Sequence, residues 1–127
     1  MQRLLLVCLG GALGSGARYL VGVLAVRLFG LGFPWGTLFV NLVGCFLMGL
    51  IMALGMGLAS FPPTLRLALT TGFLGGLMTY SSFNFETTWL ALDGALASAL
   101  VNFGVTALGG LLAGLGGLAL GRMFVPG

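Results

Sequence analysis

The chain has 127 residues, of which 59% are hydrophobic and only 6% are charged. A soluble domain carries roughly 25% charged residues, so this composition excludes a soluble fold. Because a membrane-spanning helix needs about 20 apolar residues, a chain of this length holds four such helices only with short connections and no separate soluble domain. A net charge of +3, spread thinly over the sequence, is too sparse for a nucleic-acid surface.

The first predicted helix covers about residues 3–29. It is longer than the apolar part of a secretory signal and carries Arg18 where a cleavage site would stand, so we expect it to be retained. Gly10 and Gly14 lie inside it, and small residues let helices pack closely in lipid. The glycines and proline at 30–34 predict its end and the start of the next helix.

The second predicted helix, at about 35–59, carries a short polar row. Thr37, Asn41 and Gly44 stand at positions i, i+4 and i+7, which places them on one face. A polar side chain in hydrocarbon needs a partner or a water-filled path. Asn41 is therefore either a hydrogen-bonding link to another helix or an amide that faces a pathway.

The third predicted helix, at about 64–91, contains Gly75-Gly76 followed by a run of hydroxyl and aromatic residues. Paired glycines weaken a helix, and Thr and Ser side chains can satisfy the backbone groups that a break releases. The alternatives are a kinked but closed helix and two half-helices that meet between residues 75 and 82, and we expect the second. In the second case, freed carbonyl groups can hold a cation.

The fourth predicted helix, at about 95–122, follows the turn at Asp93-Gly94. Asn102 and Thr106 stand one turn apart on it, with Gly110 continuing the row. Three of the four helices thus carry polar rows, the pattern of a narrow permeation path. The chain has no histidine, lysine or paired carboxylate, which argues against an enzyme.

The predicted path is rich in hydrogen-bond donors and poor in acids, which favours a small anion as the solute. Amide, hydroxyl and ring-edge groups dominate, and Glu86 is the only carboxylate within a predicted helix. Arg18 either adds positive potential to a vestibule or anchors the first helix at the membrane interface.

The arginines bear on membrane orientation. With four spans, Arg3, Arg66 and Arg122 share one side, whereas Arg27 and Asp93 share the other. The positive-inside rule favours termini in the cytoplasm, but the bias is small. A weakly biased chain can insert in both orientations, so we hypothesise an antiparallel homodimer.

Three motifs carry a resemblance to a known family. They are GGALGSGARY at 10–19, GTLFVNLVGCFLMG at 36–49 and GFLGGLMTYSSF at 72–83. They resemble the patterns GGxxGxxxRY, GTLxxNxxGxFxxG and GFxGGxTTFSTF of the Fluc (CrcB-type) fluoride channels. The resemblance covers essentially the whole chain, in the same order on four predicted spans.

The resemblance implies an all-α channel domain over 1–127 that works as an antiparallel, dual-topology homodimer in the cell (inner or plasma) membrane. It implies passive fluoride efflux through two pores and a structural sodium ion on the dimer axis. The sodium ligands would be the backbone carbonyls of Gly75 and Met78, although the family commonly has threonine at the second position. The residues expected to line the pore are Thr37, Asn41, Tyr80, Ser81, Ser82, Phe83, Asn102 and Thr106.

Two other functions are the alternatives to a fluoride channel. A small proton-coupled multidrug or guanidinium exporter needs a membrane carboxylate early in the chain, and here Glu86 would have to serve. A non-transporting membrane subunit would account for the many glycines as packing residues, but not for the coincident polar rows.

Overall fold

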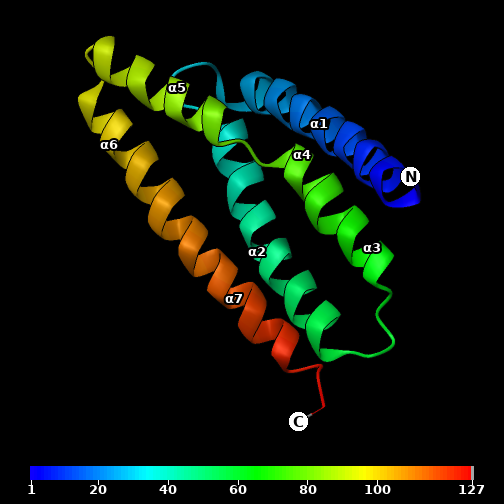
Figure 1. Ribbon diagram of the computed structural model, residues 1–127. Helices are drawn as coiled ribbons and strands as arrows, with labels where there is room; N and C mark the ends of the chain where they lie inside the picture. Colours follow the sequence, from blue (N-terminus) through cyan, green and yellow to red (C-terminus); the bar gives the residue numbers. More distant parts are fainter. Residues whose placement is uncertain (127) are drawn as a thin grey trace.

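The computed structural model describes residues 1–126, and all of the regular structure within that range is helical. Figure 1 shows the course of the chain through four helical segments. The first two segments are α1 (Gln2–Phe29) and α2 (Trp35–Gly57). The third comprises α3 (Pro63–Leu67), the π-helical turns η1 (Ala68–Leu74), α4 (Gly75–Leu77) and α5 (Tyr80–Leu92). The fourth comprises α6 (Leu96–Gly104), η2 (Val105–Gly109) and α7 (Gly110–Arg122).

Three of these segments are long and apolar enough to cross a membrane as continuous helices: Gln2–Phe29, Trp35–Gly57 and Leu96–Arg122. The third segment is interrupted at Met78 and Thr79, where the backbone is extended. The prediction of four helices with a break in the third is therefore confirmed. The break is shorter than the expected stretch of residues 75–82, because α4 continues to Leu77 and α5 begins at Tyr80.

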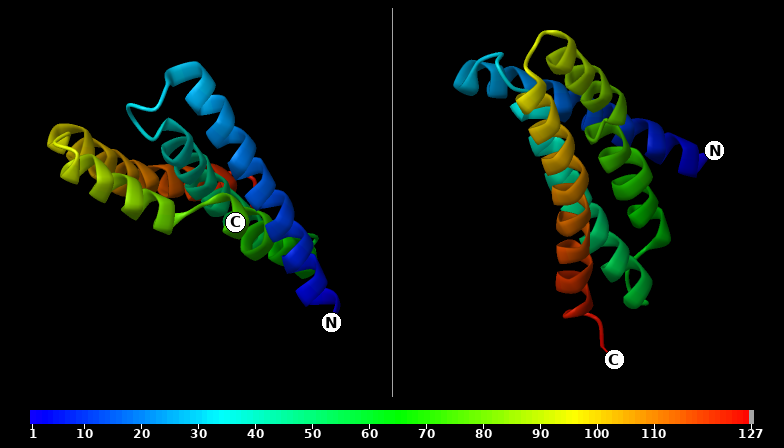
Figure 2. Two further views of the ribbon diagram at one scale, coloured as in Figure 1. Left: turned by 90° about the horizontal axis from the view of Figure 1, so that it is seen from above. Right: turned by 90° about the vertical axis from the view of Figure 1, so that its left-hand side faces the viewer.

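Helix α2 lies at the centre of the chain and contacts every other segment. Helix α1 packs across η1 and α4, while α7 runs along α2 (Figure 1). Helices α5 and α6 form a hairpin that projects away from α1, which Figure 2 shows from two further directions. The break in the third segment thus separates a half packed on α1 from a half packed on α6.

Glycines set the close approach of α1 to the first half of the third segment. A Cβ atom on Gly14 would collide with the backbone carbonyl of Phe73, and one on Gly76 would collide with that of Gly11. At Gly44 on α2, the space of a Cβ is taken by the side chain of Met78. Small residues therefore allow backbone-to-backbone contact here, as in other membrane helix pairs.

The same device joins α2 to α7. A Cβ atom on Gly49 would collide with the carbonyl of Gly114, and one on Gly117 would collide with that of Phe46. The preceding residue, Gly116, is different, because the nearest atom to its Cβ position is a ring carbon of Phe46 at 4.0 Å. Neighbouring glycines on α7 thus have opposite steric surroundings.

Alanine substitutions at Gly117 and Gly116 form a matched pair that tests this packing. Gly117→Ala should destabilise the fold by about 1–3 kcal/mol, because the new methyl group meets backbone that must move. Gly116→Ala should leave stability unchanged or slightly raised, because alanine is the better helix former. The thermal unfolding midpoints of the two purified variants in detergent check this, and equal midpoints would contradict the packing described for α2 and α7.

Candidate functional site

The site is built around the break in the third segment, where Asn41 of α2 pairs with the backbone of Thr79. The Asn41 Nδ2 donates to the Thr79 carbonyl at 3.1 Å, and the Thr79 N–H donates to Asn41 Oδ1 at 2.8 Å. Both residues are buried. One side-chain amide therefore replaces the two helical partners that Thr79 lacks, as burial in an apolar medium requires.

The Thr79 side chain then starts the second half-helix. Its Oγ1 accepts a hydrogen bond from the Ser82 N–H at 3.2 Å, which makes Thr79 the N-cap of α5. The same oxygen lies 3.2 Å from Ser81 Oγ and 3.1 Å from Ser82 Oγ. The sequence prediction did not include Thr79 as a site residue, although a threonine directly after a helix break is a standard capping signal.

Two carbonyls at the break lose their usual helical donors. In a continuous helix the Gly75 carbonyl would accept a hydrogen bond from the Thr79 N–H, which here donates to Asn41 Oδ1. The Met78 carbonyl would accept one from the Ser82 N–H, which here donates to Thr79 Oγ1. Gly75 is exposed on the surface of the single chain. The Gly75 and Met78 carbonyl oxygens are therefore available to another ligand.

An open groove of about 460 Å³ lies beside the break, between α2, α5 and the fourth segment. Helix α2 contributes the Asn41 amide to it, and η2 contributes the Thr106 hydroxyl. None of its lining residues is a carboxylate. The lining residues are Asn41, Cys45, Met78, Thr79, Tyr80, Phe83, Phe103, Thr106 and Ala107.

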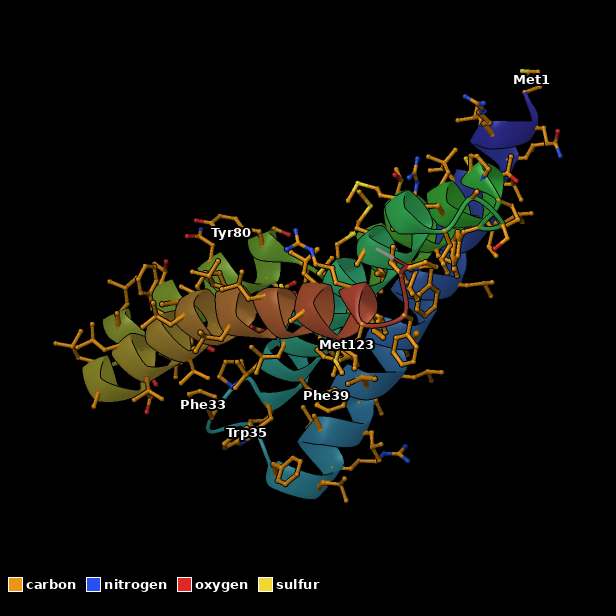
Figure 3. The ribbon with its side chains drawn as sticks, turned by 90° about the horizontal axis from the view of Figure 1, so that it is seen from below. Met1, Phe33, Trp35, Phe39, Tyr80 and Met123 are labelled. Carbon is orange, nitrogen blue, oxygen red and sulfur yellow. The ribbon has the colours of Figure 1, made fainter. Side chains whose placement is uncertain are left out.

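Aromatic rings form one wall of this groove. Phe83 is only 6% exposed, and its ring meets the edge of Tyr80 with centroids 5.6 Å apart and stacks on Phe103 with centroids 6.1 Å apart. Tyr80 itself is 77% exposed on the outer surface of the chain, as Figure 3 shows. Ring edges carry partial positive charge, so they suit an anion better than a cation.

The polar pair on the fourth segment divides between two environments. Thr106 lines the groove, whereas Asn102 is 1% exposed and is not among the lining residues. Asn102 Nδ2 donates to Thr87 Oγ1 on α5 at 2.9 Å, and Thr106 Oγ1 donates to Asn102 Oδ1 over a long 3.5 Å. Thr87 is a second residue that the sequence prediction did not include.

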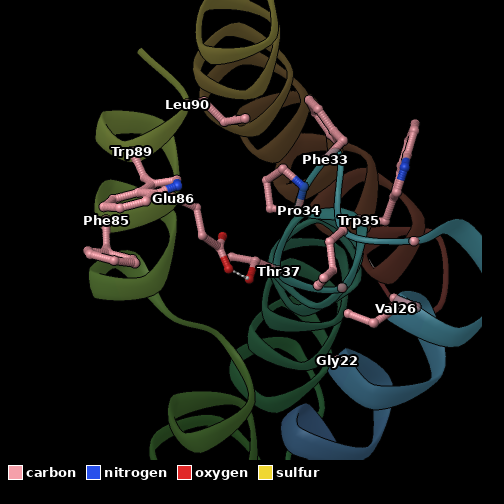
Figure 4. A pocket seen from close by; sticks show the side chains of 14 residues that line it. Gly22, Val26, Phe33, Pro34, Trp35, Thr37, Phe85, Glu86, Trp89 and Leu90 are labelled. Atoms are coloured by element: carbon pink, nitrogen blue, oxygen red, sulfur yellow. Dashed lines mark hydrogen bonds between the residues drawn. The ribbon is translucent and has the colours of Figure 1, made fainter. Parts of the chain in front are cut away.

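Thr37 lies in a separate cavity of about 250 Å³, between α1, α2 and α5, shown in Figure 4. Its hydroxyl donates to Glu86 Oε1 at 2.7 Å. The other carboxylate oxygen of Glu86 is buried and has no hydrogen-bond partner within residues 1–126. Trp35 and Trp89 also line this cavity. Thr37 and Asn41 therefore share a face of α2, but each holds a different part of the third segment.

The remaining predicted site residues lie outside both groups. Arg18 is half-buried on α1 and does not line the groove, and Ser81 is exposed. Ser82 is half-buried and touches the groove only through its hydrogen bond to Thr79. The fold thus brings Asn41, Phe83 and Thr106 together from three segments.

Comparison with known proteins places the chain in a family. A family model described as "CrcB-like protein, Camphor Resistance (CrcB)" matches residues 5–118. The chain belongs to the CrcB family. With three continuous candidate spans and a divided third segment, it is a multi-pass membrane protein.

Curated CrcB relatives match over most or all of their length. A protein named "Fluoride-specific ion channel FluC" from Anaeromyxobacter dehalogenans is 52% identical over 122 residues, which cover 96% of this chain and 97% of the relative. Proteins of the same name from Geobacter sp. (strain M21) and Sorangium cellulosum are 53% identical over 102 residues and 42% identical over 127 residues. The Geobacter match covers 80% of this chain and 82% of the relative. The Sorangium match covers both proteins completely.

The pairing of Asn41 with the break can be tested through stability. Asn41→Leu should lower the unfolding free energy by about 1–3 kcal/mol for each backbone group of Thr79 left unsatisfied. The matched control is Asn84→Leu, since Asn84 is exposed on α5. Thermal unfolding in detergent measures both, and an Asn41→Leu midpoint equal to that of the control would show that the amide does not hold the break.

Proposed function

We propose that this chain is the subunit of a fluoride-specific ion channel that lets fluoride leave the cell passively. The observation that carries the proposal is the groove at the break, which offers donors and ring edges and has no carboxylate among its lining residues. The CrcB relatives, which are named as fluoride-specific channels and match end to end, support the same solute. None of them is named as an enzyme.

Asn41 is the proposed central donor. Its amide carries two N–H groups, and one of them donates to the Thr79 carbonyl, which leaves the second for an anion in the groove. Thr106 and Phe83 line the same groove. A strongly hydrated anion loses its water only where such donors replace it, and this replacement is the proposed basis of permeation.

The other predicted residues keep proposed roles along the path. Ser81 and Ser82 are proposed to extend the line of hydroxyls from Thr79, and the exposed Tyr80 is proposed to present its ring and hydroxyl to the anion. Thr37 and Arg18 are proposed to act nearer the ends of the path. The predicted pore residue Asn102 is 1% exposed and bonds Thr87 instead of lining the groove, so it is not proposed to contact the anion.

The working unit is proposed to be an antiparallel homodimer with two pores. In the single chain the groove is open on one side. Gly75, whose carbonyl is one of the two at the break, is exposed. A second copy in the opposite orientation would cover both features. Membrane insertion in two orientations also agrees with the small charge bias between the two ends of the chain.

A structural sodium ion is proposed at the dimer axis, held by the Gly75 and Met78 carbonyls. These are the two carbonyls whose usual donors bond elsewhere, so the fit rests on backbone oxygen atoms and not on the methionine side chain. Backbone carbonyls at broken membrane helices are known ligands for sodium. Two oxygens per chain leave an ion short of ligands, which is a second reason to expect a partner chain. When bound, the ion supplies fixed positive charge between the half-helices.

The function is tested by fluoride release from liposomes that contain the purified chain. We expect rapid fluoride efflux, followed with a fluoride-selective electrode, and chloride efflux slower by at least about a hundredfold, because donors matched to a small anion discriminate by several kcal/mol. Liposomes without protein are the control. Equal fluoride and chloride rates would overturn fluoride specificity, and no efflux of either ion would overturn the channel assignment.

The sodium proposal is tested separately from permeation. Replacing sodium with caesium throughout purification should lower the thermal midpoint of the dimer, because the break carbonyls lose a ligand that binds only the folded state. Restoring sodium should restore the midpoint in a concentration-dependent manner. A midpoint that is the same in both cations would argue against the site.

A further inference from the structure

A hydrogen-bonded chain runs from the fourth segment to the backbone of Phe83. Asn102 Nδ2 donates to Thr87 Oγ1 at 2.9 Å, and Thr87 Oγ1 donates its own proton to the Phe83 carbonyl at 2.7 Å. The order of donors is consistent, because the Thr87 hydroxyl gives one hydrogen bond and accepts one. The 1% exposure of Asn102 means that water does not compete for its amide.

A second link joins the same two helices at the same level. The ring of Phe103, the residue after Asn102, stacks on the ring of Phe83 with an interplanar angle of 27°. Helix α5 packs mainly on α6, and few of its residues approach α2. The placement of Phe83 therefore depends on the contacts between α5 and α6.

The four residues that link α5 to α6 differ in their access to the groove. Phe83 and Phe103 line it, whereas Thr87 and Asn102 do not. Thr87 and Asn102 stand behind the aromatic wall and touch it through hydrogen bonds to backbone and hydroxyl groups. A Ser or Thr hydroxyl that donates to the carbonyl one turn earlier often bends its helix. Here the Thr87 hydroxyl donates to the Phe83 carbonyl, so such a bend falls on the turn that carries Phe83.

We infer that Thr87 and Asn102 are positioning residues for permeation, which hold the α5 turn that presents the Phe83 ring to the groove. The inference rests on the proposed fluoride path and assigns Asn102 a place behind that path instead of on its wall. The Thr87 hydroxyl is the critical group, because it connects the amide of α6 to the carbonyl of Phe83. Its removal leaves the Asn102 amide buried without an acceptor on α5 and releases the turn.

Three variants at neighbouring positions on α5 separate the hydroxyl from the bulk of the side chain. Thr87→Val keeps the shape and removes the hydroxyl, Thr87→Ser keeps the hydroxyl, and Thr88→Val makes the same change at an exposed residue. We expect Thr87→Val to slow fluoride efflux about tenfold, the effect of losing about 1.4 kcal/mol of transition-state stabilisation. Thr87→Ser should restore most of the rate, and Thr88→Val should match the unaltered protein.

The readout must exclude a loss of folded protein. Rates are therefore normalised to the amount of dimer recovered by gel filtration, and the half-saturating fluoride concentration is measured alongside the maximal rate. We expect Thr87→Val to alter the maximal rate or the half-saturation in protein that remains dimeric. A normalised rate equal to that of Thr88→Val, or a Thr87→Ser rate as low as that of Thr87→Val, would overturn the inference.

A second variant covers the case in which Thr87→Val does not assemble. Asn102→Leu leaves Thr87 in place and removes the donor from α6, and it should also slow normalised efflux; an unchanged rate would overturn the inference. The unaltered protein distinguishes a failure of the proposed function from a failure of the positioning role. If the unaltered protein passes no fluoride, the proposed function fails, whereas fluoride flux that is insensitive to both variants removes only the positioning role.

Discussion

The structure depends on how one peptide group is satisfied where a helix stops inside an apolar medium. A membrane helix can break only if other groups replace its lost hydrogen bonds, since water is absent. Here the two atoms of the Asn41 amide pair with the N–H and carbonyl of Thr79, and the Thr79 hydroxyl caps the next helix. The extended backbone at Met78 and Thr79 can persist only because α2 lies close enough to supply that amide.

Glycine contributes to that proximity and to the other close helix contacts, because the Met78 side chain at the break occupies the space of a Cβ atom at Gly44 of α2. Backbone contacts at Gly14 and Gly76 hold the first half of the third segment against α1, and contacts at Gly49 and Gly117 hold α7 against α2. In lipid, helices gain little from burying apolar surface against each other, so close packing of small residues carries more of the association. The glycines therefore position the polar side chains of α2, although they carry no polar side chain themselves.

The polar residues of this chain join its helices. Thr37 binds Glu86, Asn41 binds Thr79, and Asn102 binds Thr87, so three of the four residues in the polar rows of α2 and the fourth segment have a partner on the third segment. Asn41 and Thr106 also line the groove. The same few polar groups therefore join the helices at the break and line the space beside it.

The number of helices and the region of the break could be predicted from the sequence, because hydrophobic length and runs of hydroxyl residues act locally along the chain. The paired glycines themselves stay helical in α4, and the extended backbone lies at Met78 and Thr79. The motifs at 10–19, 36–49 and 72–83 likewise identified the family. The capping role of Thr79 had a local signal, but its partner Asn41 on α2 and the partner of Thr87 on α6 lie far along the chain and could not be predicted. Their roles follow from how α2 and α6 meet α5.

What the sequence determined by itself is therefore the membrane-spanning class, the four segments and the residue types available to a path. Only the tertiary structure decided which polar residues face the groove and which face another helix. Asn102 and Thr106 have the same helical spacing and similar chemistry, yet one is buried against Thr87 and the other lines the groove. The physical reason is that a helical period assigns residues to a face, whereas the neighbour of that face is set by packing between segments far apart in the sequence.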